Sequence, residues 1–197
     1  MAIDNGILIS CADLQAVGGI REIFLTNLDN IAGITYDTAT GKHDISSLTT
    51  TVDWARFEFK HEVAAMTING TKENGSTAYE VGLNFYLPNI TGAKFHELMN
   101  LSYDPGACIV ACVKLNSGKQ FVIGLSERYE ALSGGSTQWL RNQTFANLTT
   151  IEGGSGSAYA DDNGVTVTIM ARQFDLPYEY TGTMSIDSTN DFNGETT

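Results

Sequence analysis

The stretch Tyr79-Glu-Val-Gly-Leu-Asn-Phe-Tyr-Leu87 alternates large apolar residues with smaller or more polar ones. A period of two residues is typical of a β-strand with one face against a core and the other face in water. The segment Trp54-Ala-Arg-Phe-Glu-Phe-Lys60 alternates in the same way, and the tight-turn pair Asn74-Gly75 lies between the two segments. We therefore predict that residues 54–87 form one long antiparallel hairpin, part of which projects beyond the core of the domain.

Five further stretches have the character of strands. The run Gly18-Gly-Ile-Arg-Glu-Ile-Phe-Leu25 leads into a buried strand, and Ile31–Tyr36 follows it after a turn. Cys108–Leu115 and Lys119–Leu125 predict a second hairpin; its first arm is apolar at nearly every position, so we expect burial on both faces. The stretch Val165–Ile169 alternates again and predicts a closing strand.

One short helix is predicted, over residues 91–101. Thr91 is a suitable cap for its first turn. Phe95, Leu98 and Met99 are spaced i, i+3, i+4, which places them on one apolar stripe that should face the core. An Asp-Pro-Gly run then ends the helix.

Two kinds of segment lack this periodicity. Residues 130–163 contain two glycine and serine runs, which predict loops that leave the surface and return. Residues 1–17 read as an N-terminal arm and 181–197 as a flexible C-terminal tail. The fold class predicted is mainly β: a single domain over residues 1–180, an antiparallel β-sandwich or small barrel with one flanking helix and a projecting hairpin.

Composition and charge exclude several classes of function. The net charge is −12 in a chain of 197 residues, and a field of this sign repels phosphate backbones and anionic lipid headgroups. The longest apolar run, Cys108–Val113, is far shorter than the roughly 18 residues of a membrane-spanning helix. The 3 cysteines are odd in number and have no evident pairing, which favours a reducing compartment.

A search for catalytic and binding motifs finds none. No glycine run has phosphate-loop spacing, and no serine lies in a nucleophile elbow. His43, His61 and His96 lie far apart and have no second ligand at a metal-binding spacing. Cys108 and Cys112 lie in an apolar strand, where burial raises a thiol pKa and favours a packing role. We therefore expect no catalytic residue, no metal and no cofactor, and a protein that is not an enzyme.

The order of these elements resembles that of the tail tube proteins (major tail proteins) of tailed bacteriophages. The similarity spans roughly residues 17–180. It is carried by the run 18–25, by Phe57-Glu-Phe59 leading into the Asn74-Gly75 hairpin, by Phe95-His-Glu-Leu98 and by Gly164–Ile169. The resemblance implies hexameric rings whose hairpins jointly form a β-barrel lumen, stacked into a tube that conducts the genome.

The resemblance also implies roles for individual residues and partners. The candidates for the lumen face are Glu58, Glu62, Glu80 and Asn84, and those for packing within the hairpin or between subunits are Phe57, Phe59, Val81, Leu83 and Phe85. Trp139 and Leu140 are candidates for ring stacking. The expected partners are further copies of the chain, the tape measure, terminator and baseplate proteins, and a sheath where a tail has one. DNA is cargo that an acidic lumen should not retain, and the location is the virion tail, assembled in the host bacterial cytoplasm.

Two alternatives stay open. The first is another phage protein of β architecture, such as a tail terminator, a baseplate component or a head decoration protein. The second is a secreted bacterial surface or adhesion module, suggested by the Thr- and Asn-rich composition and by Leu8-Ile-Ser-Cys11, which has the form of a lipoprotein cleavage site.

Overall fold

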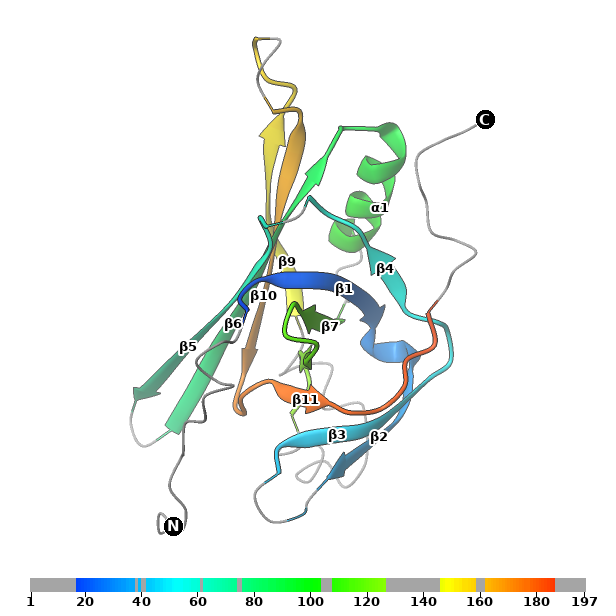
Figure 1. The fold of residues 1–197 in the computed structure, drawn as a ribbon, viewed down its shortest axis with the longest axis vertical. Helices are drawn as coiled ribbons and strands as arrows, with labels where there is room; N and C mark the ends of the chain where they lie inside the picture. Colours follow the sequence, from blue (N-terminus) through cyan, green and yellow to red (C-terminus); the bar gives the residue numbers. More distant parts are fainter. Residues whose placement is uncertain are drawn as a thin grey trace.

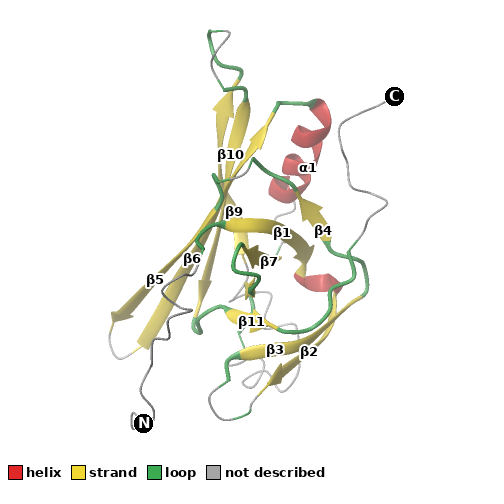
Figure 2. Ribbon diagram, in the orientation of Figure 1, coloured by secondary structure: helices red, strands yellow, loops and turns green. Residues whose placement is uncertain are grey.

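The computed structural model describes residues 17–37, 39, 42–60, 62–73, 76–103, 108–126, 146–158 and 162–186. Strands dominate this part of the chain (Figures 1 and 2). The strands are β1 (Ile20–Asn27), β2 (Ile31–Asp37), β3 (Asp44–Thr50), β4 (Ala55–Phe57), β5 (Ala65–Glu73), β6 (Ser76–Pro88), β7 (Ile109–Leu115), β8 (Gln120–Ile123), β9 (Ala146–Gly154), β10 (Gly164–Gln173) and β11 (Tyr178–Tyr180). A 3-10 turn, η2 (Leu28–Asn30), joins β1 to β2, and one α-helix, α1 (Gly92–Tyr103), follows β6.

The strands form two layers. β9, β10, β6 and β5 are neighbours in that order and all their pairings are antiparallel; we call these four strands the long sheet. The other layer runs β2-β3-β11-β8-β7, with β1 next to β7 and β4 next to β1. A single residue pair, Ile109 with Ala146, joins the two layers between β7 and β9. The arrangement is that of a β-sandwich, so the predicted mainly β fold class is confirmed. One pair, β3 with β11, is parallel, so the strands are not antiparallel throughout as predicted.

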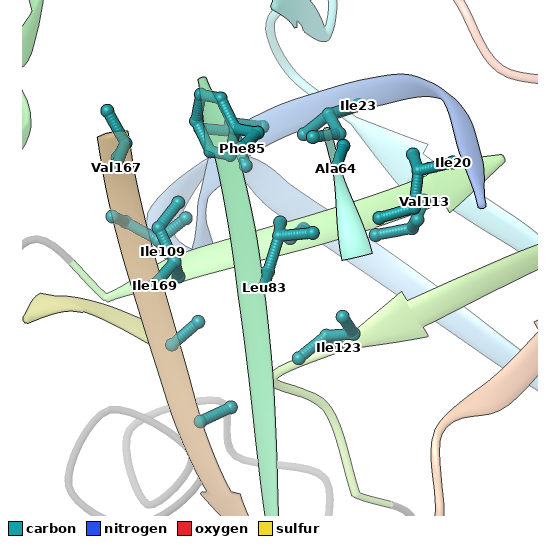
Figure 3. Close-up of a cluster of buried hydrophobic side chains, with 14 of the residues drawn as sticks. Ile20, Ile23, Ala64, Leu83, Phe85, Ile109, Val113, Ile123, Val167 and Ile169 are labelled. Atoms are coloured by element: carbon teal, nitrogen blue, oxygen red, sulfur yellow. The ribbon is translucent and has the colours of Figure 1, made fainter. Parts of the chain in front are cut away.

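Strand β7 lies at the centre of the molecule and is buried on both faces. Ile109, Ala111 and Val113 pack into a cluster that fills the space between β1, β7 and the long sheet (Figure 3). The alternate residues of β7, among them Cys112, pack into a second cluster with residues of β1, β3, β8 and β11. The expected burial of this strand on both faces is thus confirmed. Burial also raises the pKa of the Cys112 thiol to about 12.

The predicted hairpin over residues 54–87 is wrong in its first arm. β6 has the predicted alternation: Val81, Leu83 and Phe85 are buried and the residues between them are not. Its partner, however, is β5, and Glu73 pairs with Ser76 across the predicted turn, whose two residues lie outside the described part. β4 pairs instead with β1. The chain turns sharply between β4 and β5, where Glu62 has a positive φ of 65°.

The predicted helix forms, but its buried stripe differs. The backbone N–H of Lys94 donates to Oγ1 of Thr91 (3.3 Å), so Thr91 caps the first turn as expected. Leu98 is 2% exposed, whereas Phe95 and Met99 are 41% and 47% exposed. The helix packs on the core through positions 98 and 101, which leaves the other side of the predicted stripe in water.

Two segments predicted to be irregular are part of the packed structure. β9 lies within the predicted loop region 130–163 and pairs with β10 along its length. Residues 181–186, assigned to a flexible tail, follow β11 and pack beside β3 and Trp54: the N–H of Thr181 donates to Ile45 O, and Trp54 pairs with Ile186. The predicted arm as far as residue 16, the loop residues Trp139 and Leu140, and residues 187–197 lie outside the described part.

Candidate assembly surface

The long sheet ends in two open edges. Within the described residues, β5 has β6 on one side and no strand on the other. β9 is paired with β10, and on its other side it pairs with the described chain only at Ala146. An open edge presents unpaired backbone N–H and C=O groups, which a strand of another chain can satisfy.

The two edges are complementary in direction. Because each neighbouring pair of the four strands is antiparallel, β5 and β9 run in opposite directions. The β9 edge of a second copy, placed beside β5, would therefore continue the antiparallel pattern without interruption.

The edges are also staggered along the strands. Thr150, at the middle of β9, is level with Thr168, Asn84 and Ala65 across the sheet. The middle of β5 is Asn69, which pairs with Glu80. Measured along β6, the middle of β9 is therefore level with Asn84 and the middle of β5 with Glu80, an offset of four residues. The offset accumulates over three strand-to-strand steps, so it is a little more than one residue per step, a stagger typical of closed barrels whose strands tilt by about 35–45°.

The face of the long sheet turned away from the core is rich in hydroxyl and amide groups; we call it the outer face. The pairing of the strands places on it Thr67, Asn69, Thr71, Glu80, Asn84, Tyr86, Asn147, Thr150, Glu152, Thr166, Thr168, Met170 and Arg172. The charged residues among the side chains described there are two glutamates and one arginine, so this part of the outer face is close to neutral although the chain carries −12.

Two of the four predicted lumen residues lie on the outer face. Glu80 and Asn84 are exposed there, and Nδ2 of Asn84 donates to Oγ1 of Thr168 (3.3 Å). Glu58 follows the end of β4 and forms an ion pair with Arg56 (2.9 Å), and Glu62 lies in the turn before β5. The prediction that all four share one hairpin face is wrong, because β4 is not part of the hairpin.

The predicted packing residues lie inside the subunit. Phe57 and Phe59 pack against the ring of Phe85, each with a centroid distance of 6.3 Å. Val81, Leu83 and Phe85 belong to the central cluster and are fully or almost fully buried. These five residues hold the long sheet to the second layer; Val81, Leu83 and Phe85 are not available to another copy, whereas Phe57 and Phe59 are only partly buried.

Two tyrosines lie across glycines in the long sheet. A Cβ atom at Gly70 would lie 3.0 Å from the ring of Tyr79, and one at Gly164 would overlap the ring of Tyr86. An aromatic ring over a glycine on the next strand covers exposed backbone and supports the strand pairing. Both strands next to β6 are supported in this way, so the hairpin is expected to keep its shape where it leaves the core.

Comparison of the chain with protein-family models, with curated proteins and with solved structures finds no match.

The described residues hold few groups suited to chemistry. No cluster of three or more metal-ligating side chains occurs among them, and none of their helices is long and apolar enough to span a bilayer. A partly buried polar network joins Ser126, Asp175 and Tyr178, with both hydroxyls donating to the Asp175 carboxylate. This network ties the end of β8 to the β10–β11 connection, which is a structural role.

The sequence analysis missed β9, the strand that provides the second edge. Its register shifts between Thr168 and Ile169, which leaves one extra residue, Thr149, on β9. Before Thr149 the residues that face the core have even numbers, and after it they have odd numbers. Leu148 and Ile151 therefore lie on the same face of β9 although they do not fit one alternating pattern. A search that allowed one inserted residue would have found the strand.

Proposed function

We propose that this chain is a tail tube subunit, the self-assembling conduit of a tailed bacteriophage virion. The observation that carries the proposal is the long sheet, whose two open edges run antiparallel and are staggered by four residues. Copies joined β5 to β9 make a head-to-tail contact, which closes into a ring under cyclic symmetry.

The strand number gives such a ring a wide lumen. Six copies that each add the four strands of the long sheet would close a barrel of about 24 strands, and roughly 16–18 strands already enclose an aqueous channel. The outer face would line this channel, because the opposite face is covered by the second layer.

The chemistry of the outer face suits a conduit for DNA. Proteins hold DNA chiefly through lysine and arginine contacts to phosphates. The single arginine of the outer face, Arg172, lies directly opposite Glu80 on the neighbouring strand. The lining proposed is thus neutral and hydroxyl-rich instead of acidic, and it offers the passing duplex few phosphate contacts.

Negative-stain electron microscopy of the purified chain over a range of concentrations tests the proposal. We expect hollow tubes built of stacked rings, with β5 and β9 of neighbouring copies protected together from hydrogen exchange. Single closed rings that never stack would favour a terminator or baseplate ring. Monomers at every concentration, with both edges exchanging freely, would contradict the proposal.

A further inference from the structure

A pocket lies at the end of the molecule opposite the β5–β6 turn. It has a volume of about 260 Å³ and opens between α1, β4 and the C-terminal end of β1; we call it the α1–β4 pocket. Leu25, Phe57, Leu101 and Ile109 form its apolar floor. The volume is below the roughly 300–1,000 Å³ of small-molecule pockets and suits a single long side chain.

Two carboxylates line this pocket. Asp53 precedes β4 and Glu97 lies on α1, and both are exposed. Among the described residues, neither forms an ion pair. An apolar floor below two carboxylates fits a lysine, whose stem packs on apolar groups while its ammonium group stays at the rim.

The tip of the β5–β6 hairpin has the complementary chemistry. Lys72 pairs with Thr77 close to the turn, is exposed, and forms no ion pair within the described residues. Ile68 lies on the same face of β5 and is 43% exposed, because the core ends at Met66. The tip thus presents an apolar side chain followed by a cation.

Lys72 is better placed for docking than the other cations without a carboxylate partner in the described part. Arg172 lies on the outer face opposite Glu80, and Arg21 lies on β1 within the second layer. The ammonium group of Lys94 donates to the carbonyl oxygens of Pro88 and Asn89. Of these four residues, Lys72 alone lies on an arm that leaves the body of the molecule (Figure 1).

We infer that the hairpin tip of one copy docks into the α1–β4 pocket of the next copy, with Lys72 between Asp53 and Glu97. The tip cannot reach the pocket of its own chain, because β6 separates the two by about 40 Å of extended strand. The contact joins opposite ends of the molecule, so it is heterologous and propagates along an axis. It rests on the proposed function, in which it is the contact between successive rings.

Cross-linking between copies tests the docking directly. Equal amounts of nitrogen-15-labelled and unlabelled protein are mixed, assembled and treated with a carbodiimide, which joins an amine to a carboxylate in direct contact. Peptides that link Lys72 to Asp53 or Glu97 and carry both labels show a contact between copies. We expect this link in assembled protein and a loss of at least tenfold in monomer.

Charge reversal tests the same contact through assembly. Lys72→Glu should raise the concentration needed for tube formation by about tenfold, while rings still form. Combining Lys72→Glu with Glu97→Lys should restore it to within about threefold. Arg21→Glu is the matched control, because it makes the same change of charge at a distant exposed cation and should leave tubes unaffected.

The outcomes separate this inference from the proposed function. Tubes that form equally well in all variants, without the cross-link, would overturn the docking and leave the tail tube proposal standing. A cross-link in linear filaments, without rings, would support the docking and overturn the tube. A chain that stays monomeric without the cross-link would contradict both.

Discussion

Gln173 is a fully buried polar residue that holds two backbone segments together. Its Oε1 accepts a hydrogen bond from the N–H of Gly124 (3.0 Å), and its Nε2 donates to the carbonyl oxygen of Asp175 (2.8 Å). The side chain therefore satisfies one donor after β8 and one acceptor after β10, and the network of Ser126 and Tyr178 lies next to it. A buried amide with both ends bonded fixes the relative position of these two connections.

Replacing this amide by an apolar side chain should be costly. Gln173→Leu leaves the Gly124 N–H and the Asp175 carbonyl without partners, and we expect the free energy of unfolding to fall by about 2–4 kcal/mol in urea denaturation. Gln120→Leu is the control, since the buried Oε1 of Gln120 has no hydrogen-bond partner within the described residues. That variant should change stability by less than about 1 kcal/mol, and an equal loss in both variants would contradict the assignment.

The buried thiol of Cys112 makes stability depend on alkaline pH. Its pKa is raised from 9.0 to about 12, so between these values the unfolded chain has lost a proton that the folded chain keeps. The free energy of unfolding must then fall as pH rises, by about 1.4 kcal/mol between pH 8 and pH 10. In Cys112→Ala this part of the decline should disappear.

Urea unfolding of both proteins at the two pH values checks this. The raised pKa of Tyr180 acts in the same direction but is present in both proteins, so the difference between them isolates Cys112. An identical decline in the two proteins would show that the thiol ionises in the folded state.

At the scale of elements, sequence periodicity predicts strands better than it predicts their partners. The alternation or continuous burial of β1, β6, β7, β8 and β10 is visible in the sequence, because each strand has its own inward positions. The partner of β4 is not visible, because a run of three strand residues fits any open edge and the turn at Glu62 decides which edge it meets. The candidate site could be predicted only in part for the same reason. Glu80 and Asn84 lie on β6, whose alternation is visible in the sequence, whereas the bulge in β9 interrupts the alternation that would have revealed the second edge.

A proline on the open edge of β5 should block ring formation. Successive N–H groups of an edge strand point alternately to its partner and to the open side. Ile68 and Asn69 are consecutive, so the N–H of one of them points to the open side of β5. Proline at that position removes only this outward N–H and leaves the β5–β6 pairing intact, so Ile68→Pro and Asn69→Pro are both made. We expect that variant to fold, with unchanged circular dichroism, and to remain monomeric.

The control for this test is an open edge of the second layer. β2 ends the second layer, so Ile34→Pro and Thr35→Pro make the same pair of changes at an edge outside the proposed contact. The folded member of this pair should still form rings. Loss of assembly in both pairs would argue against a specific role for β5.

For the whole molecule, the position of charge matters more than its sum. The chain carries −12, yet the described side chains of the outer face include one arginine against two glutamates. Most of the negative charge must therefore lie away from the proposed lining, where it keeps copies soluble and repels nucleic acid outside the lumen.

Adding lysines to the outer face should make assembled tubes retain DNA. Thr71→Lys with Thr150→Lys places two cations per copy on β5 and β9, and we expect duplex to be held at about 50 mM salt and released towards 200 mM, as counterion release requires. Ser47→Lys with Thr49→Lys adds the same charge to exposed positions of β3. Ejection assays should be slowed by the first pair only; equal slowing by both pairs would place the outer face outside the lumen.

The order of strands in the long sheet also sets a schedule for synthesis. β10 lies between β6 and β9, yet β6 ends at residue 88 and β10 ends at residue 173. At roughly 5–20 residues per second, a nascent chain holds its β5–β6 hairpin for several seconds before the strands of the second edge emerge from the ribosome. Two unfinished chains on one polysome both lack that edge and cannot join. In the proposed assembly, every new contact thus requires at least one chain whose β9 and β10 have already been synthesised.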